Sequence, residues 1–428
     1  MIGIRRLMDL IVAYFPTYSE KGLYTAQTPD GEPVELLTSE SEVLTAQIFK
    51  TIVDPFVGRI SYVKVLSGIL SSDSTVVNAN NGATEKIGSI YIIKGKHQTA
   101  VGKLFTGDIG AVTKLQNTHT NDTLCEKNKL LIADPITFDE PMYGQAIFPK
   151  TKNDEDKLST GLSRLLEEDP TFKVVNNKET GQTIIYGIGD QHLDVILSKL
   201  ASKYKVGVTT EDPKVTYRET ITKKATGEGR HKKQSGGHGQ FGHVFVDFEP
   251  NEDSEELVFD EKVFGGAVPK QYFPAVETGL RECSLSGPLA GYKMVYLKTT
   301  LMDGKYHDVD SSEMAFKMAA HLAFKDAMGK CHPILLEPIM NVRVVVPDAY
   351  TGTIIGDLNK RRGAIMGMEP QEDDQIIDAQ VPLAEMLRYS LDLRSMSQGL
   401  GKYTMTMDRY DPVPEPIAQK IIAQHHSE

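Results

Sequence analysis

Residues 143–210 read YGQAIFPKTKNDEDKLSTGLSRLLEEDPTFKVVNNKETGQTIIYGIGDQHLDVILSKLASKYKVGVTT, and this stretch indicates most directly how the chain folds. Its apolar residues switch between the two-residue period of strands and the longer period of helices. Strand patterns occupy 143–151, 172–177, 181–189 and 205–210, and helical patterns occupy 155–168 and 190–203. The order strand, helix, strand, strand, helix, strand is that of a split βαβ, ferredoxin-like unit. We therefore predict a ferredoxin-like domain over residues 140–213.

The same order of elements recurs near the end of the sequence. Strand patterns are found in NVRVVVP, GAIMGMEPQ, IIDAQVP and GKYTMTMDRY, and helices are predicted at 351–362 and 383–394. This repetition predicts a second ferredoxin-like domain over residues 334–410. Residues 411–428 follow as a tail, in which 414–425 have the pattern of a short amphipathic helix.

Residues 214–333 lie between the two repeats and have strand patterns early and a strong helical pattern late. Asp310 and Glu313 have the spacing of a capping box at the start of this helix. The buried face of the helix is predicted from the apolar residues Ala315, Met318, Ala319, Leu322 and Ala323. The segment is therefore predicted to be an α+β domain.

Short strands separated by turns dominate residues 42–139. The strand patterns are VLTAQIFKTIV, RISYVKVLSG, STVVNAN, KIGSIYIIKG, DIGAVTKL and KLLIADPITF. Turn signals such as Asn80-Asn81-Gly82 separate them. Short strands at this spacing predict a small closed β-barrel.

Residues 1–41 begin with a helical pattern that Pro16 ends, followed by a polar, turn-rich stretch that we interpret as a linker. The helix has apolar groups on one face and needs a surface on which to pack. We interpret it as the last helix of a preceding domain, and the alternative is an N-terminal helix docked on the next domain. The predicted fold class is multidomain α+β, with separately folded units and few contacts between 214–333 and the rest.

Composition limits the classes of partner. The net charge is −11 and the pI is about 5.6, so a contact with nucleic acid must be local. Three cysteines at distant positions, without a CxxC pair, indicate free thiols in a reducing cytosol. No apolar run approaches 18 residues, which argues against a membrane partner.

The sequence lacks the motifs of common enzymes. It contains no GxxxxGK[ST] phosphate loop, no Asn/Thr-Lys-x-Asp signature, and no HExxH, GxSxG or CxxC. A glycine-rich stretch at 235–242 lacks the strand and helix that would direct amides at a phosphate. We therefore predict no catalytic residue, cofactor site or metal site in this chain, and no binding of GTP by it. A hydrolase that uses the His- and Gly-rich loop remains an alternative.

Two clusters of basic residues suggest RNA contact instead. Residues 218–243 hold six Lys and Arg against two Glu, interspersed with Gly, Gln, Ser and His. Cations gain affinity for phosphate by counterion release, and the polar groups can reach 2′-hydroxyls. A second cluster at 359–363 ends a predicted helix, where positive charge also suits the helix dipole. For both clusters a purely structural role stays open, as a solvated hairpin in the first case.

Several longer motifs, in the same order, resemble translation elongation factor G. They are KQSGGHGQFG, GGAVPKQYFPAVETG, GPLAGY, YHDVDSSEMAFKMAAHLAFKDA, LLEPIMNVRVVVPDAYTGTIIGDLNKRRG and VPLAEMLRYSLDLRSMSQGLGKYTM. The resemblance runs along the whole chain. It implies that the N-terminal helix is the last helix of a GTPase domain that is absent here. Residues 42–139 then resemble domain II, 140–213 domain III, 214–333 domain IV and 334–410 domain V. Domain IV is expected to have the fold of ribosomal protein S5 domain 2.

The resemblance also implies which residues contact RNA or the ribosome. Domain IV is the arm that the family places in the decoding-centre A site, and its tip loops would be 235–240 and 304–312. His307 has no partner nearby in sequence that would suggest a structural role. The expected contact residues are Lys232, Lys233, Gln234, Ser235, Gly236, Gly237, His238, Gly239, Gln240, Tyr306, His307, Asp308, Lys360, Arg361 and Arg362.

The function implied is GTP-dependent translocation of tRNA and mRNA. GTP and Mg²⁺ would bind only in the GTPase domain of the full-length parent, a cytoplasmic monomer. Its partners would be ribosomal RNA of both subunits, ribosomal proteins, and tRNA with mRNA in the A site. YIIKGKHQTAV, His238 and Phe241 depart from the usual family pattern and resemble divergent elongation factor G-like paralogues. The alternative function is ribosome recycling, rescue or drug protection on the same scaffold.

Overall fold

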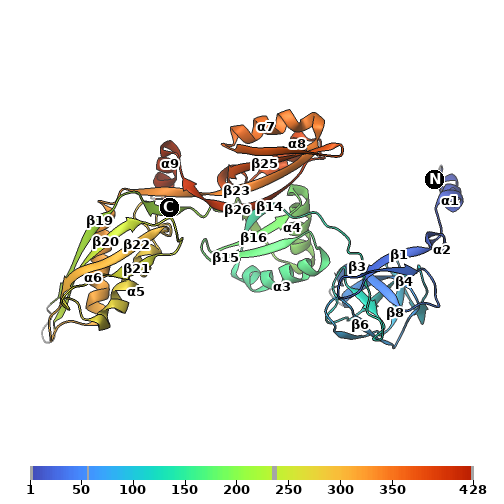
Figure 1. The fold of residues 1–428 in the computed structure, drawn as a ribbon. Helices are drawn as coiled ribbons and strands as arrows, with labels where there is room; N and C mark the ends of the chain where they lie inside the picture. The colour runs from blue at the N-terminus through green and yellow to red at the C-terminus, as the bar shows by residue number, and fades with distance from the viewer. Residues whose placement is uncertain (1–2, 55–56, 234–238, 426–428) are drawn as a thin grey trace. The chain divides into compact units, whose positions relative to one another are not determined.

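The computed structural model describes residues 3–54, 57–233 and 239–425 (Figure 1). The chain divides into two compact units, residues 1–212 and 213–428. Both units combine β-sheets with helices, which confirms the predicted multidomain α+β class. Within the described residues, no helix is both long and apolar enough to cross a membrane.

The N-terminal helix α1 extends over Ile4–Tyr14, as its spacing predicts. The chain leaves the helix at Phe15, which is extended, and Pro16 follows. None of the helix residues is buried, and the side chains of Leu7, Met8 and Val12 are exposed. The apolar face of α1 is therefore uncovered by the rest of the described chain.

The segment after α1 is held against the barrel, which corrects the prediction of a linker there. Helix α2, Tyr18–Lys21, is a single turn that begins with a hydrogen bond from the Thr17 amide to the Glu20 carboxylate. The Tyr18 hydroxyl donates to the carbonyl of Leu66, at 3.1 Å. Turn-rich composition concealed this short anchoring helix.

A hairpin occupies the rest of the predicted linker. Strand β1, Leu23–Gln27, pairs with β2, Pro33–Leu37, and with β13, Ile132–Ala133. Ala26 and Leu36 are buried in an apolar cluster that also contains residues of the barrel strands. Only one residue in each strand is fully buried, so the alternation of apolar and polar residues was too weak to predict a strand.

Domain II is a curved sheet around one apolar core. Its strands are β3 (Thr45–Asp54), β4 (Gly58–Ser67), β5 (Leu70–Ser71), β6 (Thr75–Asn78), β7 (Thr84–Lys86), β8 (Ile90–Lys94), β9 (His97–Val101), β10 (Lys103–Leu104), β11 (Ile109–Thr113) and β12 (Thr123–Cys125). The main sheet has the order β7-β6-β12-β3-β4-β11-β8-β9, and β5 pairs with β10. Every strand of this domain except β7 and β9 supplies at least one fully buried residue to the core, and β9 packs against the core with Val101. Because the strands share one core, the sheet must curl into a barrel. The predicted small β-barrel is thus confirmed, and in the described residues the two end strands of the main sheet, β7 and β9, do not pair with each other.

Domain III has the predicted ferredoxin-like order. Its elements are β14 (Tyr143–Pro149), α3 (Lys152–Glu168), β15 (Lys173–Asn177), β16 (Gln182–Gly187), α4 (Asp190–Tyr204) and β17 (Val208–Glu211). The sheet order is β15-β16-β14-β17 and every pair is antiparallel. Helix α3 begins where the Thr151 hydroxyl accepts from the Asp154 amide. The prediction from the spacing of residues 143–210 is confirmed.

Domain IV contains a four-stranded sheet with two helices packed on it (Figure 1). Its elements are β18 (Arg218–Ile221), β19 (Ala225–Lys233), β20 (Gln240–Pro250), β21 (Val258–Glu261), α5 (Phe273–Ser284), β22 (Leu297–Lys305) and α6 (Glu313–Met328). The sheet order is β19-β20-β22-β21, with β21 parallel to β22. Helix α5 was not predicted, and β18 pairs outside this sheet.

The start and buried face of α6 differ from the prediction. The residue that caps the start of the helix is Ser312, whose hydroxyl accepts from the Ala315 amide, whereas the Asp310 carboxylate accepts from the Gly239 amide. Leu322 is exposed and Met318 is half-buried. The buried side chains are Ala315, Phe316, Ala319, Ala320, Ala323, Phe324, Ala327 and Met328. The helix is turned so that its alanines face the sheet.

Glycines in the strands allow α6 to lie very close to the sheet. A Cβ placed on Gly229 would be 1.8 Å from the carbonyl oxygen of Ala319, and one on Gly227 would be 2.1 Å from that of Ala323. Gly242 of β20 has a similar contact, 2.6 Å, with the carbonyl oxygen of Ala315. No side chain fits at these distances, so the helix and strands depend on glycine there.

Domain V repeats the order of domain III. Its elements are β23 (Pro333–Pro347), α7 (Thr351–Lys360), β24 (Ala364–Gln371), β25 (Asp374–Pro382), α8 (Tyr389–Met396) and β26 (Lys402–Pro412), and the tail helix α9 spans Glu415–His425. Strand pairing gives β24-β25-β23-β26, which confirms the second ferredoxin-like unit. The tail helix is confirmed as well.

The helix predicted at 383–394 is broken. Residues Leu383–Glu385 form a 3₁₀ turn and α8 starts only at Tyr389. The Glu385 carbonyl accepts from the Arg361 guanidinium at 2.6 Å, and the Tyr389 amide donates to Met386 instead. A tertiary hydrogen bond thus replaces the one that would continue the helix.

Domains IV and V are joined more firmly than predicted. Strand β23 is continuous over 333–347, across the boundary expected at 334. Its first residues, 333–336, pair with β18 of domain IV, and the following residues pair with β25 and β26. Both domains belong to one compact unit, which differs from the expected separate units, although strand pairing between them in the described part of the chain is limited to β18 and β23.

We predict that Gly229→Ala destabilises domain IV by about 3 kcal/mol, because the added methyl group displaces α6. Hydrogen exchange of α6 and β19 measured in increasing urea should show this loss. The control is Gly356→Ala on the exposed side of α7, where a Cβ meets nothing within 4 Å. It should stabilise its helix by about 0.5–1 kcal/mol. Equal stability of the two variants would contradict the close packing.

Candidate RNA-binding surface

The tip of domain IV is built where strands β19, β20 and β22 end. Lys233 pairs with Gln240 across β19 and β20, and His243 pairs with Lys305 across β20 and β22. This register places the ends of all three strands together. It also brings the segment before Phe241 beside the loop that follows Lys305.

Hydrogen bonds connect these two segments. The Gly239 amide donates to the Asp310 carboxylate at 2.9 Å, and the Phe241 amide donates to the Asp310 carbonyl at 2.8 Å. The Ser311 hydroxyl donates to the Phe241 carbonyl at 2.9 Å and accepts from the His307 amide at 2.8 Å. The loop is therefore fixed on the sheet, although its residues 305–309 are exposed.

His307 has a structural role that the sequence did not reveal. Its Nδ1 accepts from the amides of Val309, at 3.3 Å, and Asp310, at 3.2 Å. Its ring lies edge-on to Phe241, with centroids 6.4 Å apart. The side chain is still 56% exposed, so Nε2 is available to an external acceptor. The expectation that His307 has no nearby partner is wrong.

The other tip residues expected from the sequence differ in their contacts, and some lie outside the described residues. Tyr306 and Asp308 are exposed. The Gln240 side chain accepts from the His231 ring at 3.0 Å and remains exposed. Gln234, Ser235, Gly236, Gly237 and His238 lie outside the described residues.

Cations near the tip lack carboxylate partners. No described carboxylate lies within ion-pair distance of the side chains of Arg230, Lys232, Lys233, Lys270 and Lys305. Nearer the other end of domain IV, Lys224 pairs with Asp247 at 3.1 Å and Lys330 with Asp326 at 2.6 Å. The tip therefore gathers several cations that no described carboxylate pairs with.

Arg230 is part of the basic cluster 218–243, but neither Arg230 nor Lys305 was among the individual contact residues expected from the sequence. Arg230 is on the edge strand β19 and Lys305 ends β22, opposite His243. Alternation along 225–233 would have placed Arg230 on the same face as Lys232. The position of Lys305 beside them depends on the pairing register, which the sequence does not state.

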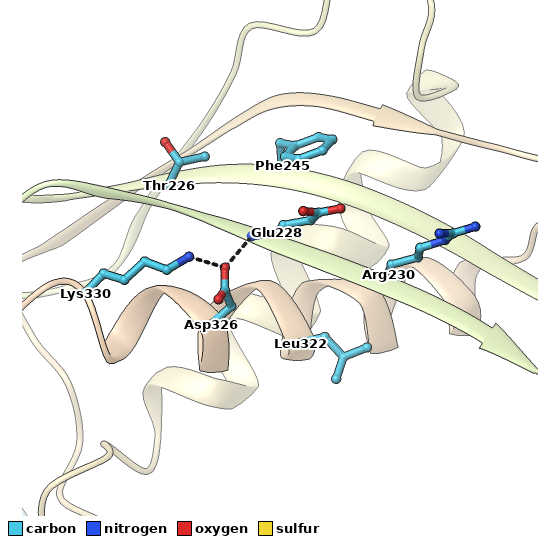
Figure 2. Close-up of a pocket in the computed structure, with 7 residues that line it drawn as sticks. All are labelled: Thr226, Glu228, Arg230, Phe245, Leu322, Asp326 and Lys330. Atoms are coloured by element: carbon cyan, nitrogen blue, oxygen red, sulfur yellow. Dashed lines mark hydrogen bonds and ion pairs between the residues drawn. The ribbon is translucent and has the colours of Figure 1, made fainter.

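A shallow hollow of about 580 Å³ lies along the flank of β19 (Figure 2). It is lined by Thr226, Glu228, Arg230, Phe245, Leu322, Asp326 and Lys330. The Asp326 carboxylate accepts from the Glu228 amide at 2.9 Å and from Lys330 at 2.6 Å (Figure 2). The Glu228 carboxylate contacts the His243 ring at 2.8 Å. These groups bind one another, and the hollow has no arrangement of nucleophile and base among its described residues.

The second basic cluster is largely structural. The Arg362 guanidinium makes two bonds to Glu337, at 2.6 and 2.8 Å, and the Glu337 carboxylate raises the pKa of that guanidinium. Arg361 pairs with Asp357 at 2.7 Å and with Asp392 at 2.6 Å. Of the three residues only Lys360 is exposed. The structural interpretation left open by the sequence fits Arg361 and Arg362 better.

Family comparisons agree with this architecture. Four family models match consecutive segments: Elongation factor G domain 2 at 43–127, Elongation Factor G, domain III at 138–212, Elongation factor G, domain IV at 213–332, and Elongation factor G C-terminus at 334–421. The chain therefore belongs to the elongation factor G family, which confirms the resemblance seen in the sequence.

A solved structure extends this similarity over the whole chain. The crystal structure of the protein ttk003000868 from Thermus thermophilus matches with a TM-score of 0.78 and 34% sequence identity. The match covers 100% of this chain and 61% of that protein. The chain thus spans less than two thirds of the length of its structural relative.

We predict that His307→Ala loosens the tip loop without unfolding the domain. The amides of Val309 and Asp310 lose their acceptor, so their hydrogen exchange should rise about tenfold. The melting temperature should change by no more than about 2 °C, because the site is on the surface. His307→Asn keeps a side-chain acceptor and should restore much of the protection. Unchanged exchange in His307→Ala would show that the ring does not hold the loop.

Proposed function

We propose that this chain is the ribosome-binding portion of an elongation factor G-like translational GTPase that promotes translocation of tRNA and mRNA. Membership in the family supports a role in translation. The consecutive matches to domains 2, III, IV and the C-terminus support an arrangement like that of the family. The proposed parent acts as a monomer in the cytoplasm.

The observation that carries this proposal is the set of unpaired cations at the tip of domain IV. A chain with net charge −11 is repelled by RNA unless its cations are concentrated locally. Arg230, Lys232 and Lys305 lie on neighbouring strands of one sheet, which orders them before binding. A cation that binds a phosphate releases counterions. If its position is already fixed before binding, little conformational entropy is lost.

GTP and Mg²⁺ belong elsewhere in the proposed parent. The sequence contains no phosphate loop, and no group of three metal-ligating His, Cys, Asp or Glu side chains occurs among the described residues. The residues present therefore do not fit a GTP–Mg²⁺ site. We assign no hydrolytic step to this chain.

The tip is proposed to act by position and hydrogen bonding. Two strand ends and one helix start hold the His307 loop, so the loop can enter an RNA cavity without becoming disordered. Movement of residues 213–428 relative to 1–212 would carry the tip during the step driven by GTP hydrolysis. Recycling, rescue or drug protection would use the same surface, and the departures in YIIKGKHQTAV and Phe241 keep that alternative open.

Ribosome binding by this chain should depend on the unpaired cations. We expect co-sedimentation with ribosomes that weakens with salt. The triple variant Arg230→Gln, Lys232→Gln, Lys305→Gln should reduce the slope of log K against log[salt] by about 2–3, since each phosphate contact contributes about 0.7–0.9.

The matched control removes the same charge from paired cations: Lys224→Gln, Lys298→Gln, Lys317→Gln. Its slope should change by less than about 1. Equal changes in both variants would reject a specific role for the tip. Failure of the unsubstituted chain to sediment at low salt would reject the proposed function and favour a different class of protein.

A kinetic test separates translocation from the alternatives. In the full-length parent, His307→Ala should slow single-round translocation about tenfold, equivalent to about 1.4 kcal/mol. Ribosome-stimulated GTP hydrolysis should continue at its usual rate, because the tip residues take no part in it. Equal loss of both would indicate a docking defect. Unchanged translocation would favour recycling, rescue or drug protection.

A further inference from the structure

The C-terminal helix α9 packs where domains IV and V join. Its residues Ile417, Ala418 and Ile421 form an apolar cluster with Leu335 and Val413 of the domain V side. The same cluster includes Tyr217 and Tyr292 from domain IV. In Figure 1, α9 lies beside the start of β23 and the end of β26. One short helix therefore contacts both domains at once.

The backbone connection beneath α9 is narrow. Strand β18 pairs with β23 through four residues only, Arg218 to Ile221 opposite Leu336 to Pro333. Leu336 also pairs with Pro412, the last residue of β26. In the strand ladder, residues 333–335 of β23 pair with β18 alone, and such a short two-stranded segment twists easily unless side chains hold it. The angle between the domains therefore depends on this pairing and on the side chains packed around it.

Aromatic and charged side chains hold one side of the ribbon. The Arg218 guanidinium lies over the Tyr410 ring, 5.1 Å from its centroid, and is 9% exposed. The Tyr410 hydroxyl donates to the Thr216 carbonyl at 3.3 Å. These contacts connect β26 of domain V to the first residues of domain IV.

A buried carboxylate holds in place the loop against which the C-terminal end of α9 packs. Glu219 is fully buried and accepts from the amides of Leu289, Ala290 and Tyr292, at 2.8, 2.9 and 3.1 Å. Gly287 is required beside it, because a Cβ there would lie 2.3 Å from the Glu219 carboxylate. The GPLAGY loop, residues 287–292, is therefore bound to β18 and carries Tyr292 toward the helix.

The last turn of α9 contacts this loop directly. The His425 ring lies 5.8 Å from the Tyr292 ring, centroid to centroid. A Cβ on Gly291 would be 3.4 Å from His425, so the loop backbone approaches the ring closely. Tyr292 in turn packs edge-on against Tyr217 at 5.4 Å. Contacts thus run without a gap from α9 through the loop to the start of domain IV.

We propose that α9 is a bridging helix that fixes the angle between domain IV and domain V, and that the angle becomes variable when the helix is displaced while each domain stays folded. The fold of domain IV does not need α9, because its core lies between α5, α6 and the sheet. The core of domain V likewise lies under α7 and α8. This inference does not depend on the proposed ribosomal function.

The test compares two pairs of serine substitutions on the two faces of α9 in the full chain. Ile417→Ser with Ile421→Ser removes the bridging contacts. Lys420→Ser with Ala423→Ser changes exposed residues of the same helix and serves as the matched control. Spin labels at Asp308→Cys and Lys360→Cys, both exposed, report the distance between the domains in a Cys283→Ala background. The remaining cysteines, Cys125 and Cys331, are buried.

The bridging variant should broaden the label-to-label distance distribution at least twofold. Hydrogen exchange in 214–219 and 286–293 should rise about tenfold, while α6 and β25 keep their protection. The control variant should match the unsubstituted chain in both measurements. An unchanged distance distribution in the bridging variant would overturn the proposal. A rise in exchange throughout α6 and β25 would overturn it too, because α9 would then support folding of the whole unit.

Discussion

The close approach of α6 to strands β19 and β20 is the contact on which the tip depends. Gly227, Gly229 and Gly242 leave no room for a Cβ against the helix backbone, and alanines cover the facing side of the helix. Because both surfaces are flat, the start of α6 at Ser312 has a fixed position over the sheet. That position in turn fixes Asp310 and Ser311, which hold the exposed His307 loop.

The cations of domain IV differ in whether a carboxylate of the chain binds them. Some cations away from the tip are bound by neighbouring carboxylates, namely Lys224 by Asp247 and Lys330 by Asp326. Toward the tip, Lys232 and Lys305 have no such partner among the described residues. An ion pair satisfied within the chain gains little from RNA, because binding must first break it. Unpaired cations are therefore better evidence for an RNA surface than the number of basic residues.

Residues 213–428 combine two domains that differ in how they are held. Within each domain an apolar core lies between helices and sheet, whereas the join uses one continuous strand, a buried carboxylate and the terminal helix. Such a join is ordered yet small, so it can hold the arm at a defined angle without merging the two cores.

The sequence by itself determined the order of elements in both ferredoxin-like units, and the family, because periodicity and motifs are local properties of the chain. It did not determine the hairpin of β1 and β2, whose strands each bury one residue, or the break before Tyr389, which a hydrogen bond from Arg361 causes. It also could not show that Lys305 has no ion-pair partner among the described residues whereas Arg362 has one. Both are basic residues at the ends of elements, and only the fold shows that Arg362 binds Glu337 whereas Lys305 lies open at the tip, since ion pairing depends on residues far apart in sequence.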